Sequence, residues 1–269
     1  MSAPPGRLVA LDGRAAQTLE AAAAARLVTG ALASEPGGVL VRPSPRTRAI
    51  LAALPDRPPV VAVLPDMAQL LRDVAEHGAL GTARARLGSA GPGAWLRIAS
   101  TGLRHAAAVA RQDFEGIVPV LIELERAGLR GAALAGVVLA APLTDLLLAA
   151  GHDDCLAYIV RFLRRQVKTR AGFETLNLGH LLARLAARGL VPDFVLGPVN
   201  PCGFRMKPSA DAVLAAIRRS AAPVLATEVS AGGALALADG VAYARAHGAA
   251  GVVVTLDEAS GQGSTAGAP

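Results

Sequence analysis

The sequence predicts a single (β/α)8 barrel, in which a closed parallel sheet is surrounded by helices. Its 269 residues match the roughly 250 that such a barrel needs. Short, continuously apolar runs alternate with alanine-rich helical segments along almost the whole chain, which is typical of parallel strands covered by helices. A hydrophobic fraction of 52% supplies a large core and excludes a disordered chain.

Nine segments have the apolar, β-branched character of strands, one more than an eight-stranded barrel uses. We expect the surplus among the first two. A doubly wound open sheet is the alternative fold, but no GxGxxG motif follows an early strand. In chain order the expected strands are Leu8–Gly13, Gly38–Pro43, Val60–Asp66, Trp95–Ser100, Gly136–Ala141, Gly172–Asn177, Phe194–Val199, Val224–Val229 and Val252–Leu256.

The segments between these strands have helical spacing of their apolar residues. The expected helices are Ala15–Leu32, Arg46–Leu54, Met67–His77, Asp113–Ala127, Asp145–Val167, Leu178–Arg188, Ala210–Ser220 and Leu237–His247.

No stretch of the chain has the composition of a linker between domains. The six residues Gly88–Gly93 are short enough to be a loop. We therefore predict one barrel domain over residues 1–258. The small and polar residues 259–269 are predicted to be a disordered tail.

The chain is basic, with 27 Lys and Arg against 21 Asp and Glu and a net charge of +6. Its one local basic cluster is Arg161, Arg164, Arg165, Lys168 and Arg170. The first four have helical spacing and lie opposite an apolar stripe, which predicts a solvated helix face. Aromatic residues make up only 3% of the chain, too few for a surface that stacks many nucleotides. A nucleic-acid partner is therefore not expected.

Membrane insertion and secretion are not expected either. The most apolar stretch, Gly131–Thr144, contains Pro142 and is shorter than the roughly 20 residues of a membrane span. The N-terminus has no secretory signal pattern, and Cys155 and Cys202 fit a reducing compartment, so a cytoplasmic location is predicted. The sequence assigns no metal ligand and no cofactor-binding residue, and it leaves the oligomeric state open.

Two glutamates have the strand phase expected of an active site at the barrel mouth. A small residue lies two positions before each glutamate: Gly172 before Glu174, and Ala226 before Glu228. Strand alternation then predicts that both glutamates point into the barrel near its carboxyl end. We expect Glu174 and Glu228 to be the catalytic acid and base. The alternative is that each is paired with an arginine such as Arg205.

The longest irregular segment after a strand, Asn200 to Ser209, predicts a substrate-binding loop. It carries Asn200, Arg205 and Lys207, and its two cations suit an anionic substrate. Lys207 is one of only two lysines and is also a candidate for a Schiff base. Asn177, at the end of an earlier strand, completes the expected substrate-binding set.

The last third of the chain resembles aldo/keto reductases in four segments: GFETLNLGHLLARL, DFVLGPVNP, VLATEVSAGGAL and AAGVVVTLDEA. Asn177 and Asn200 match positions of that family, and the resemblance implies an eight-fold barrel. The family's cofactor-contacting Gln and aromatic residue appear here as Leu196 and Val199. Its Ser-Leu pair appears as Glu228-Val229, and its Asp, Tyr, Lys and His catalytic set is not found in the first half.

These observations predict an enzyme that acts on a small polar metabolite, an anionic carbonyl or carboxylate compound. Carboxylate acid/base chemistry of this kind is typical of a lyase or an isomerase. One alternative is a divergent NADPH-dependent oxidoreductase related to the aldo/keto reductases. The other is a non-catalytic barrel scaffold that binds a partner, which would have an apolar mouth with both glutamates held by arginines.

Overall fold

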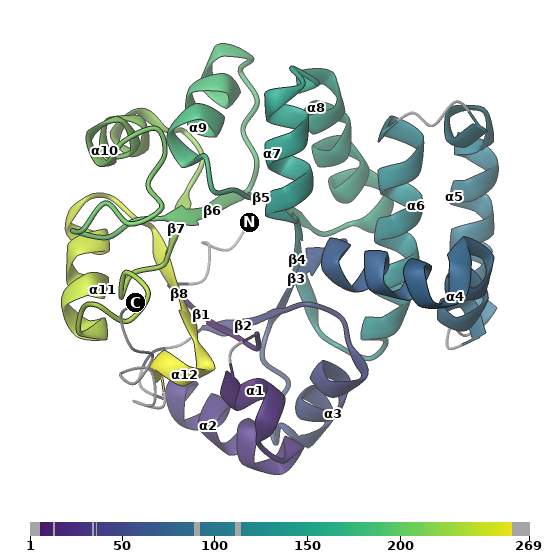
Figure 1. The fold of residues 1–269 in the computed structure, drawn as a ribbon, viewed down its shortest axis with the longest axis horizontal. Coiled ribbons are helices and arrows are strands. Elements are labelled where there is room, and N and C mark those ends of the chain that lie inside the picture. Colours follow the sequence, from purple (N-terminus) through teal and green to yellow (C-terminus); the bar gives the residue numbers. More distant parts are fainter. Residues whose placement is uncertain are drawn as a thin grey trace.

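Eight parallel strands form one closed barrel, as predicted (Figure 1). The computed structural model describes residues 6–12, 14–33, 35, 37–88, 92–110 and 114–259. Each strand pairs with the next along the chain, and β8 closes the barrel against β1. The strands are β1 (Arg7–Ala10), β2 (Gly38–Val41), β3 (Val60–Leu64), β4 (Leu134–Leu139), β5 (Arg170–Glu174), β6 (Phe194–Pro198), β7 (Val224–Thr227) and β8 (Gly251–Thr255).

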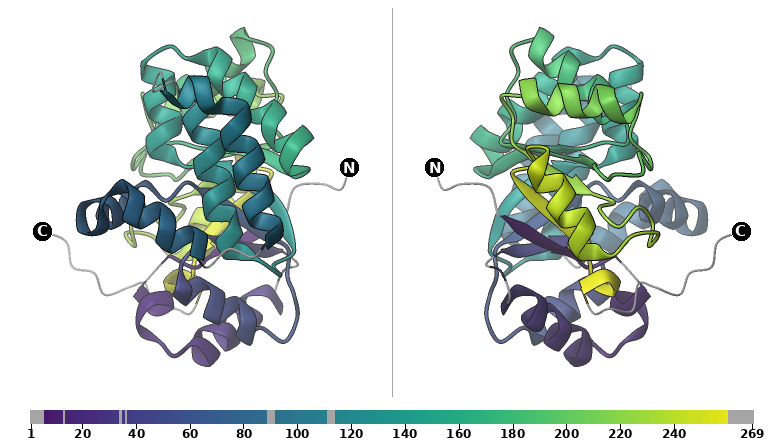
Figure 2. Two further views of the ribbon diagram at one scale, coloured as in Figure 1. Left: turned by 90° about the vertical axis from the view of Figure 1, so that its right-hand side faces the viewer. Right: turned by 90° about the vertical axis from the view of Figure 1, so that its left-hand side faces the viewer.

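Helices surround the barrel and separate consecutive strands (Figure 2). Two short segments, a 3-10 turn η1 (Ala127–Leu129) and a π-helical turn η2 (Leu163–Val167), extend α6 and α8. The helices are α1 (Arg14–Thr18), α2 (Ala21–Ala33), α3 (Pro45–Ala53), α4 (Met67–Gly88), α5 (Pro92–Ala110), α6 (Phe114–Arg126), α7 (Ala141–Ala149), α8 (Asp153–Phe162), α9 (Leu178–Ala187), α10 (Ala210–Arg219), α11 (Leu237–Ala246) and α12 (Leu256–Ala259).

The surplus strand is Trp95–Ser100, which forms part of helix α5. The prediction that it lay among the first two segments was wrong, because both of those are barrel strands. Ile98 is half-buried and Thr101 is buried, whereas Trp95 and Leu96 are 47% and 73% exposed. The buried positions are thus three residues apart, the spacing of a helix that packs one side only, here against α6.

Two glycines interrupt the helical segments, and only the second lies within a helix that the sequence predicted as continuous. Helix α4 extends beyond the expected His77 but is broken at Gly78, whose φ of 68° and ψ of 166° are not helical. The helix expected over Asp145–Val167 is two helices, α7 and α8, with Gly151 (φ 73°) between them. Residues 89–91 of the expected loop and 260–269 of the expected tail lie outside the described residues.

The strands separate two apolar layers. Their outward residues and the helices form the larger one, and their inward residues, such as Leu40, Leu196 and Val253, fill the barrel. Phe194 is fully buried inside, and a Cβ atom on Gly172 would come within 2.6 Å of its ring. Gly136 faces the same ring, so the two glycines make room for the aromatic side chain at this level of the barrel.

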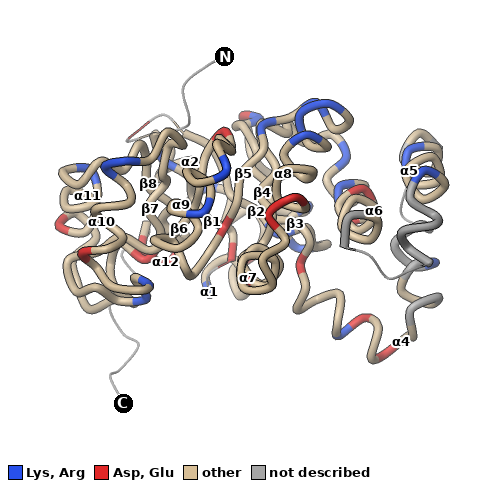
Figure 3. The backbone as a smooth tube through the Cα atoms, turned by 90° about the horizontal axis from the view of Figure 1, so that it is seen from above, with Lys and Arg blue, Asp and Glu red and all other residues tan. Residues whose placement is uncertain are grey.

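Positive charge is more frequent at the amino end of the barrel. In Figure 3, Lys and Arg outnumber Asp and Glu along the edge of the molecule from which the N-terminus extends. Helices of a (β/α)8 barrel run opposite to the strands, so their C-termini lie at this end, where the helix dipole favours cations. Basic residues in a last helical turn include Arg126, Arg161, Arg184, Arg218, Arg219 and Arg245.

The amphipathic pattern predicted for the local basic cluster is present. Arg161, Arg164, Arg165 and Lys168 are exposed, and the intervening Leu163 is fully buried. Across the described residues, no helix combines the length and the apolar character that a membrane span requires.

Candidate active site

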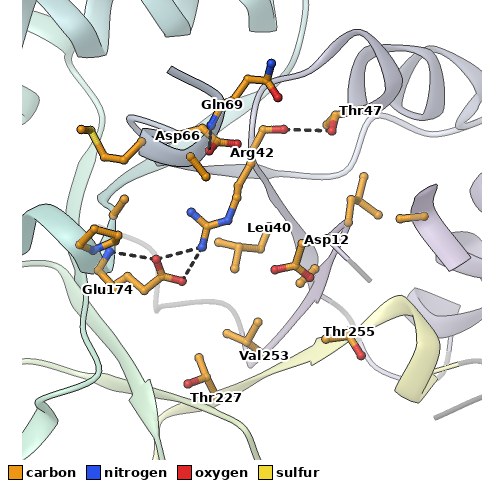
Figure 4. A pocket seen from close by; sticks show the side chains of 18 of the residues that line it. Asp12, Leu40, Arg42, Thr47, Asp66, Gln69, Glu174, Thr227, Val253 and Thr255 are labelled. Carbon is orange, nitrogen blue, oxygen red and sulfur yellow. Dashed lines mark hydrogen bonds and ion pairs between the residues drawn. The ribbon is translucent and has the colours of Figure 1, made fainter. Parts of the chain in front are cut away.

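A cavity of about 690 Å³ opens at the carboxyl ends of the strands, the end at which barrels of this class carry their sites. Its walls come from segments at the carboxyl ends of all eight strands, and Figure 4 shows part of this lining. The cavity is strongly polar, with charges of both signs. Its acidic lining residues are Asp12, Asp66, Glu174, Glu228 and Glu258, and its basic ones are Arg42, Arg46, Arg72 and Arg205.

Glu174 points into this cavity, as strand alternation predicted. It is the last residue of β5, two residues after the inward-facing Gly172. Nη2 of Arg42 donates to both of its carboxylate oxygens, at 2.9 and 3.0 Å, and the backbone N–H of Ala141 donates at 3.1 Å. The carboxylate is therefore held in one place from two directions.

Arg42 follows β2 and extends across the barrel mouth toward Glu174 (Figure 4). The hydroxyl of Thr47 fixes its backbone by donating to the Arg42 carbonyl at 2.9 Å. Burial by itself lowers the pKa of Arg42, but Glu174, Asp12 and Asp66 raise it by more, so the net pKa lies above its usual value. Arg42 is thus a permanent cation at the centre of the mouth. Among the described residues, only Nη2 of its three guanidinium nitrogens has a side-chain partner.

Asp12, two residues beyond β1, has an unusual environment for a surface-accessible carboxylate. Its side chain opens into the cavity, and no described side chain donates a hydrogen bond to it. Burial raises its pKa most, and the negative charges of Glu174 and Glu258 raise it further; Arg42 and its own backbone N–H act in the opposite direction. The net pKa lies above the usual value of 3.8, so Asp12 holds a proton more readily than an ordinary aspartate.

Two other carboxylates in the mouth cap helices. Asp66 accepts from the backbone N–H of Gln69 at 3.0 Å at the start of α4. Glu258 accepts from the backbone N–H of Thr255 at 2.7 Å, and the Thr255 hydroxyl accepts from the Glu258 N–H at 3.2 Å. This reciprocal pair is a capping box at α12. Their positions are explained by local structure.

Glu228 lines the cavity as predicted, but strand alternation is not the reason. The predicted phase of β7 was wrong, because Leu225 belongs to the barrel interior and Ala226 to the layer beneath the helices. Alternation would therefore direct Glu228 outward. However, the strand ends at Thr227, and Glu228 adopts a left-handed backbone (φ 52°) that brings its side chain to the mouth.

Arg205 pairs with Glu228, as the structural alternative for these glutamates proposed. Its Nη1 donates to Oε1 of Glu228 at 2.7 Å, and its guanidinium lies 5.2 Å from the centroid of the Phe204 ring. Arg205 also has a left-handed backbone (φ 58°), and its side chain is 54% exposed. This ion pair therefore forms the outer rim of the cavity, within reach of solvent.

Asn200 is fully buried and acts as a brace. Its Nδ2 donates to the carbonyls of Phe204 and Glu228, both at 3.0 Å, and its Oδ1 accepts from the Phe204 N–H at 2.9 Å. It joins the loop after β6 to the turn after β7 and is not part of the cavity wall. Asn200 was predicted to bind substrate. The structure instead gives it hydrogen bonds that position Phe204 and Glu228.

Asn177 and Lys207 lie outside the mouth cavity. Asn177 lines a separate cavity of about 280 Å³ together with Asp145 and His180. Lys207 is exposed, and its carbonyl accepts from the backbone N–H of Gly179 at 3.0 Å. The structure therefore brings together Glu174, Glu228 and Arg205 from the predicted set, but not these two.

Asp12 and Arg42 were not predicted from the sequence, although both lie close to a strand end, as the predicted glutamates do. Each was assigned to the interior of an expected strand, Leu8–Gly13 or Gly38–Pro43, whereas β1 ends at Ala10 and β2 at Val41. The first charged residue after each apolar run could have marked the strand end and so identified Asp12 and Arg42 as site residues.

Comparisons with family models, curated proteins and solved structures gave no match to this chain. They therefore do not support the resemblance to aldo/keto reductases, whereas the eight-stranded barrel that it implied is present. Within the described ranges, no group of three or more His, Cys, Asp or Glu is placed to hold a metal ion.

Proposed function

We propose that this protein is an enzyme that transfers a proton on a small anionic carbonyl or carboxylate compound, as a lyase or an isomerase does. The observation that carries the proposal is Asp12, an accessible carboxyl with a raised pKa, beside the Arg42–Glu174 pair in a polar cavity. A carboxyl group whose pKa moves toward neutral pH is better suited to general acid/base catalysis. Asp12 is thus the proton-transferring group.

Arg42 is suited to stabilise charge on the substrate. Glu174 engages only its Nη2, so other N–H groups remain to bind a carbonyl oxygen of the substrate. When the adjacent carbon loses a proton, negative charge develops on that oxygen, and a fixed cation lowers the barrier. Glu174 holds Arg42 in place and raises the pKa of Asp12, so we assign it a positioning role.

The outer arginines of the mouth suit an anionic group of the substrate. Arg46, Arg72 and Arg205 line the cavity around the Asp12–Arg42–Glu174 group. Arg205 is the most suitable anchor because it is half-exposed and its planar guanidinium can bind a carboxylate through two parallel hydrogen bonds. In this arrangement Glu228 holds Arg205 until the substrate arrives.

The charged mouth favours an enzyme over the two alternatives. A scaffold was expected to have an apolar mouth with both glutamates held by arginines; both ion pairs are present, but the cavity carries Asp12 and several arginines. For a reductase, the positions of the family's cofactor-contacting residues hold Leu196 and Val199. Both are fully buried in the apolar layers and do not line the cavity.

The proposal can be tested without knowing the product. Purified protein is incubated in D2O with a panel of small 2-oxo and 3-oxo acids, and proton NMR follows the loss of the signal from the carbon next to the carbonyl. We expect exchange of at least one compound by the wild type, its loss in Asp12→Asn, and its retention in Glu228→Gln. Equal exchange by Asp12→Asn would contradict the role of Asp12. Thermal stabilisation by NADPH, with no exchange, would favour the reductase instead.

A further inference from the structure

A second cavity, of about 570 Å³, lies at the opposite end of the barrel from the mouth. It is bounded by α3, by the loop that leads into β3, and by the segment from η1 to β4. Because it borders the first residue of β3, Val60, it belongs to the amino end. Its apolar wall includes Leu51, Leu54 and Leu129.

The charge of this cavity is of one sign only. Arg48, Arg57 and Arg130 line it and are all exposed, and no Asp or Glu is among its lining residues in the described part of the chain. Within that part, none of the three forms an ion pair or a side-chain hydrogen bond. The mouth differs in that it contains carboxylates to match its arginines.

Helix dipoles account for many cations at this end of the barrel, but for only one of these three. The last turn of α3 contains no basic residue, so Arg48 lies too early in the helix to benefit. Arg57 lies in the loop before β3, whereas Arg130 caps the C-terminal end of η1, where the helix dipole favours a cation. Three unpaired guanidinium groups around one apolar hollow repel one another, and a bound anion would relieve that repulsion.

We infer that this amino-end cavity is a binding site for an organic anion with an apolar body, such as a medium-chain carboxylate. The arginines take the anionic head through charge-assisted hydrogen bonds, and the leucine wall covers the hydrocarbon. The site is separate from the mouth and does not depend on the proposed reaction there.

Octanoate is the probe, and its affinity for the full chain is measured by isothermal titration calorimetry. We expect Arg57→Ala/Arg130→Ala to weaken binding by about tenfold or more, the loss anticipated for one or two charge-assisted hydrogen bonds. Arg26→Ala/Arg218→Ala removes the same charge from exposed positions outside the cavity and is the matched control. Arg205→Ala tests the mouth, and acetate tests the need for an apolar body.

We expect octanoate affinity to fall in the Arg57→Ala/Arg130→Ala variant and to stay at the wild-type value in the other variants. Acetate at the same concentration should not displace octanoate from the wild type. Equal weakening in the Arg26/Arg218 control would mean that only net charge matters and would overturn the site. Loss of binding in Arg205→Ala would assign the ligand to the mouth instead. Equal competition by acetate would exclude a role for the leucine wall, and absence of octanoate binding to the wild type would also refute the inference.

Discussion

The two sides of the barrel mouth each carry an arginine–glutamate pair, but they are built differently. On the β2–β5 side, Arg42 and Glu174 come from strand ends, and their side chains are only 31% and 17% exposed. On the β6–β7 side, Arg205 and Glu228 come from left-handed loop residues, and their side chains are 54% and 28% exposed. The first pair is fixed by the sheet and the second by a loop.

This difference separates the chemistry from the recognition of the substrate. Groups on strand ends are held by the hydrogen-bonded barrel, so their geometry can be preserved through a reaction. Loop residues can move more readily to admit a ligand. Asp12 lies with the strand-end pair, and Asn200 braces the loop pair from below. Substitutions on the two sides should therefore differ in their effects on turnover, substrate binding and stability.

The largest expected effect is on catalysis, and it belongs to the strand-end side. Asp12→Asn keeps the shape of the side chain but cannot accept or donate the catalytic proton. We expect exchange or turnover to fall by roughly 10²–10⁴-fold. Glu228→Gln, on the loop side, should change kcat by far less. Similar losses of kcat in the two variants would contradict the assignment of proton transfer to the strand-end side.

The second effect is on stability and compares the two arginines directly. Arg42→Met leaves the half-buried Glu174 without its cation and should cost about 1–3 kcal/mol, less than the loss of a fully buried pair. Arg205→Met should cost less than about 1 kcal/mol, because the pair is exposed. Urea unfolding of both variants measures the difference.

A double substitution sharpens this result. In Arg42→Met/Glu174→Met the uncompensated carboxylate is gone, so part of the lost stability should return. Equal costs for the Arg42 and Arg205 variants, or a double variant less stable than Arg42→Met, would contradict the distinction between the two pairs.

The third effect is confined to the loop side. Asn200→Ala removes three hydrogen bonds from a fully buried position and should cost about 1–3 kcal/mol. Because the strand-end groups are untouched, KM should rise more than kcat falls. Asn200→Asp is the control, since it keeps an acceptor for the Phe204 N–H but loses both donated bonds. A drop in kcat alone would place Asn200 in the catalytic machinery.

The sequence predicted the barrel well because periodicity and apolar runs are averages over many residues. It failed at Trp95–Ser100, where six residues are too few to distinguish a strand from one side of a helix. The strand-end site was partly predictable for the same reason: Glu174 followed from the alternation of β5. Arg42 and Asp12 were missed because the strand ends were placed too late.

Glu228 marks the limit of such reasoning. Its presence at the mouth depends on a left-handed backbone after β7 and on a hydrogen bond from Asn200, 28 residues earlier in the chain. Neither can be read from alternation. The phase of β7 was itself wrong because Leu225 packs inside the barrel with Leu196, whereas a small residue, Ala226, faces the helices.

The smallest effect concerns stability as a function of pH. The folded protein raises the pKa of Asp12 above its usual value of 3.8, so it binds this proton more tightly than the unfolded chain does. The stabilising contribution is therefore present below the unfolded pKa and is lost as pH rises through the folded pKa.

Asp12→Asn, which cannot ionise, should gain melting temperature relative to the wild type as pH rises through this window, while the two melt alike below it. Arg205 is not among the charges that act on Asp12, so the same divergence should appear in the Arg205→Met background. A constant difference in melting temperature at all pH values, or a gain only at low pH, would show that burial and the nearby charge of Glu174 do not raise the pKa of Asp12.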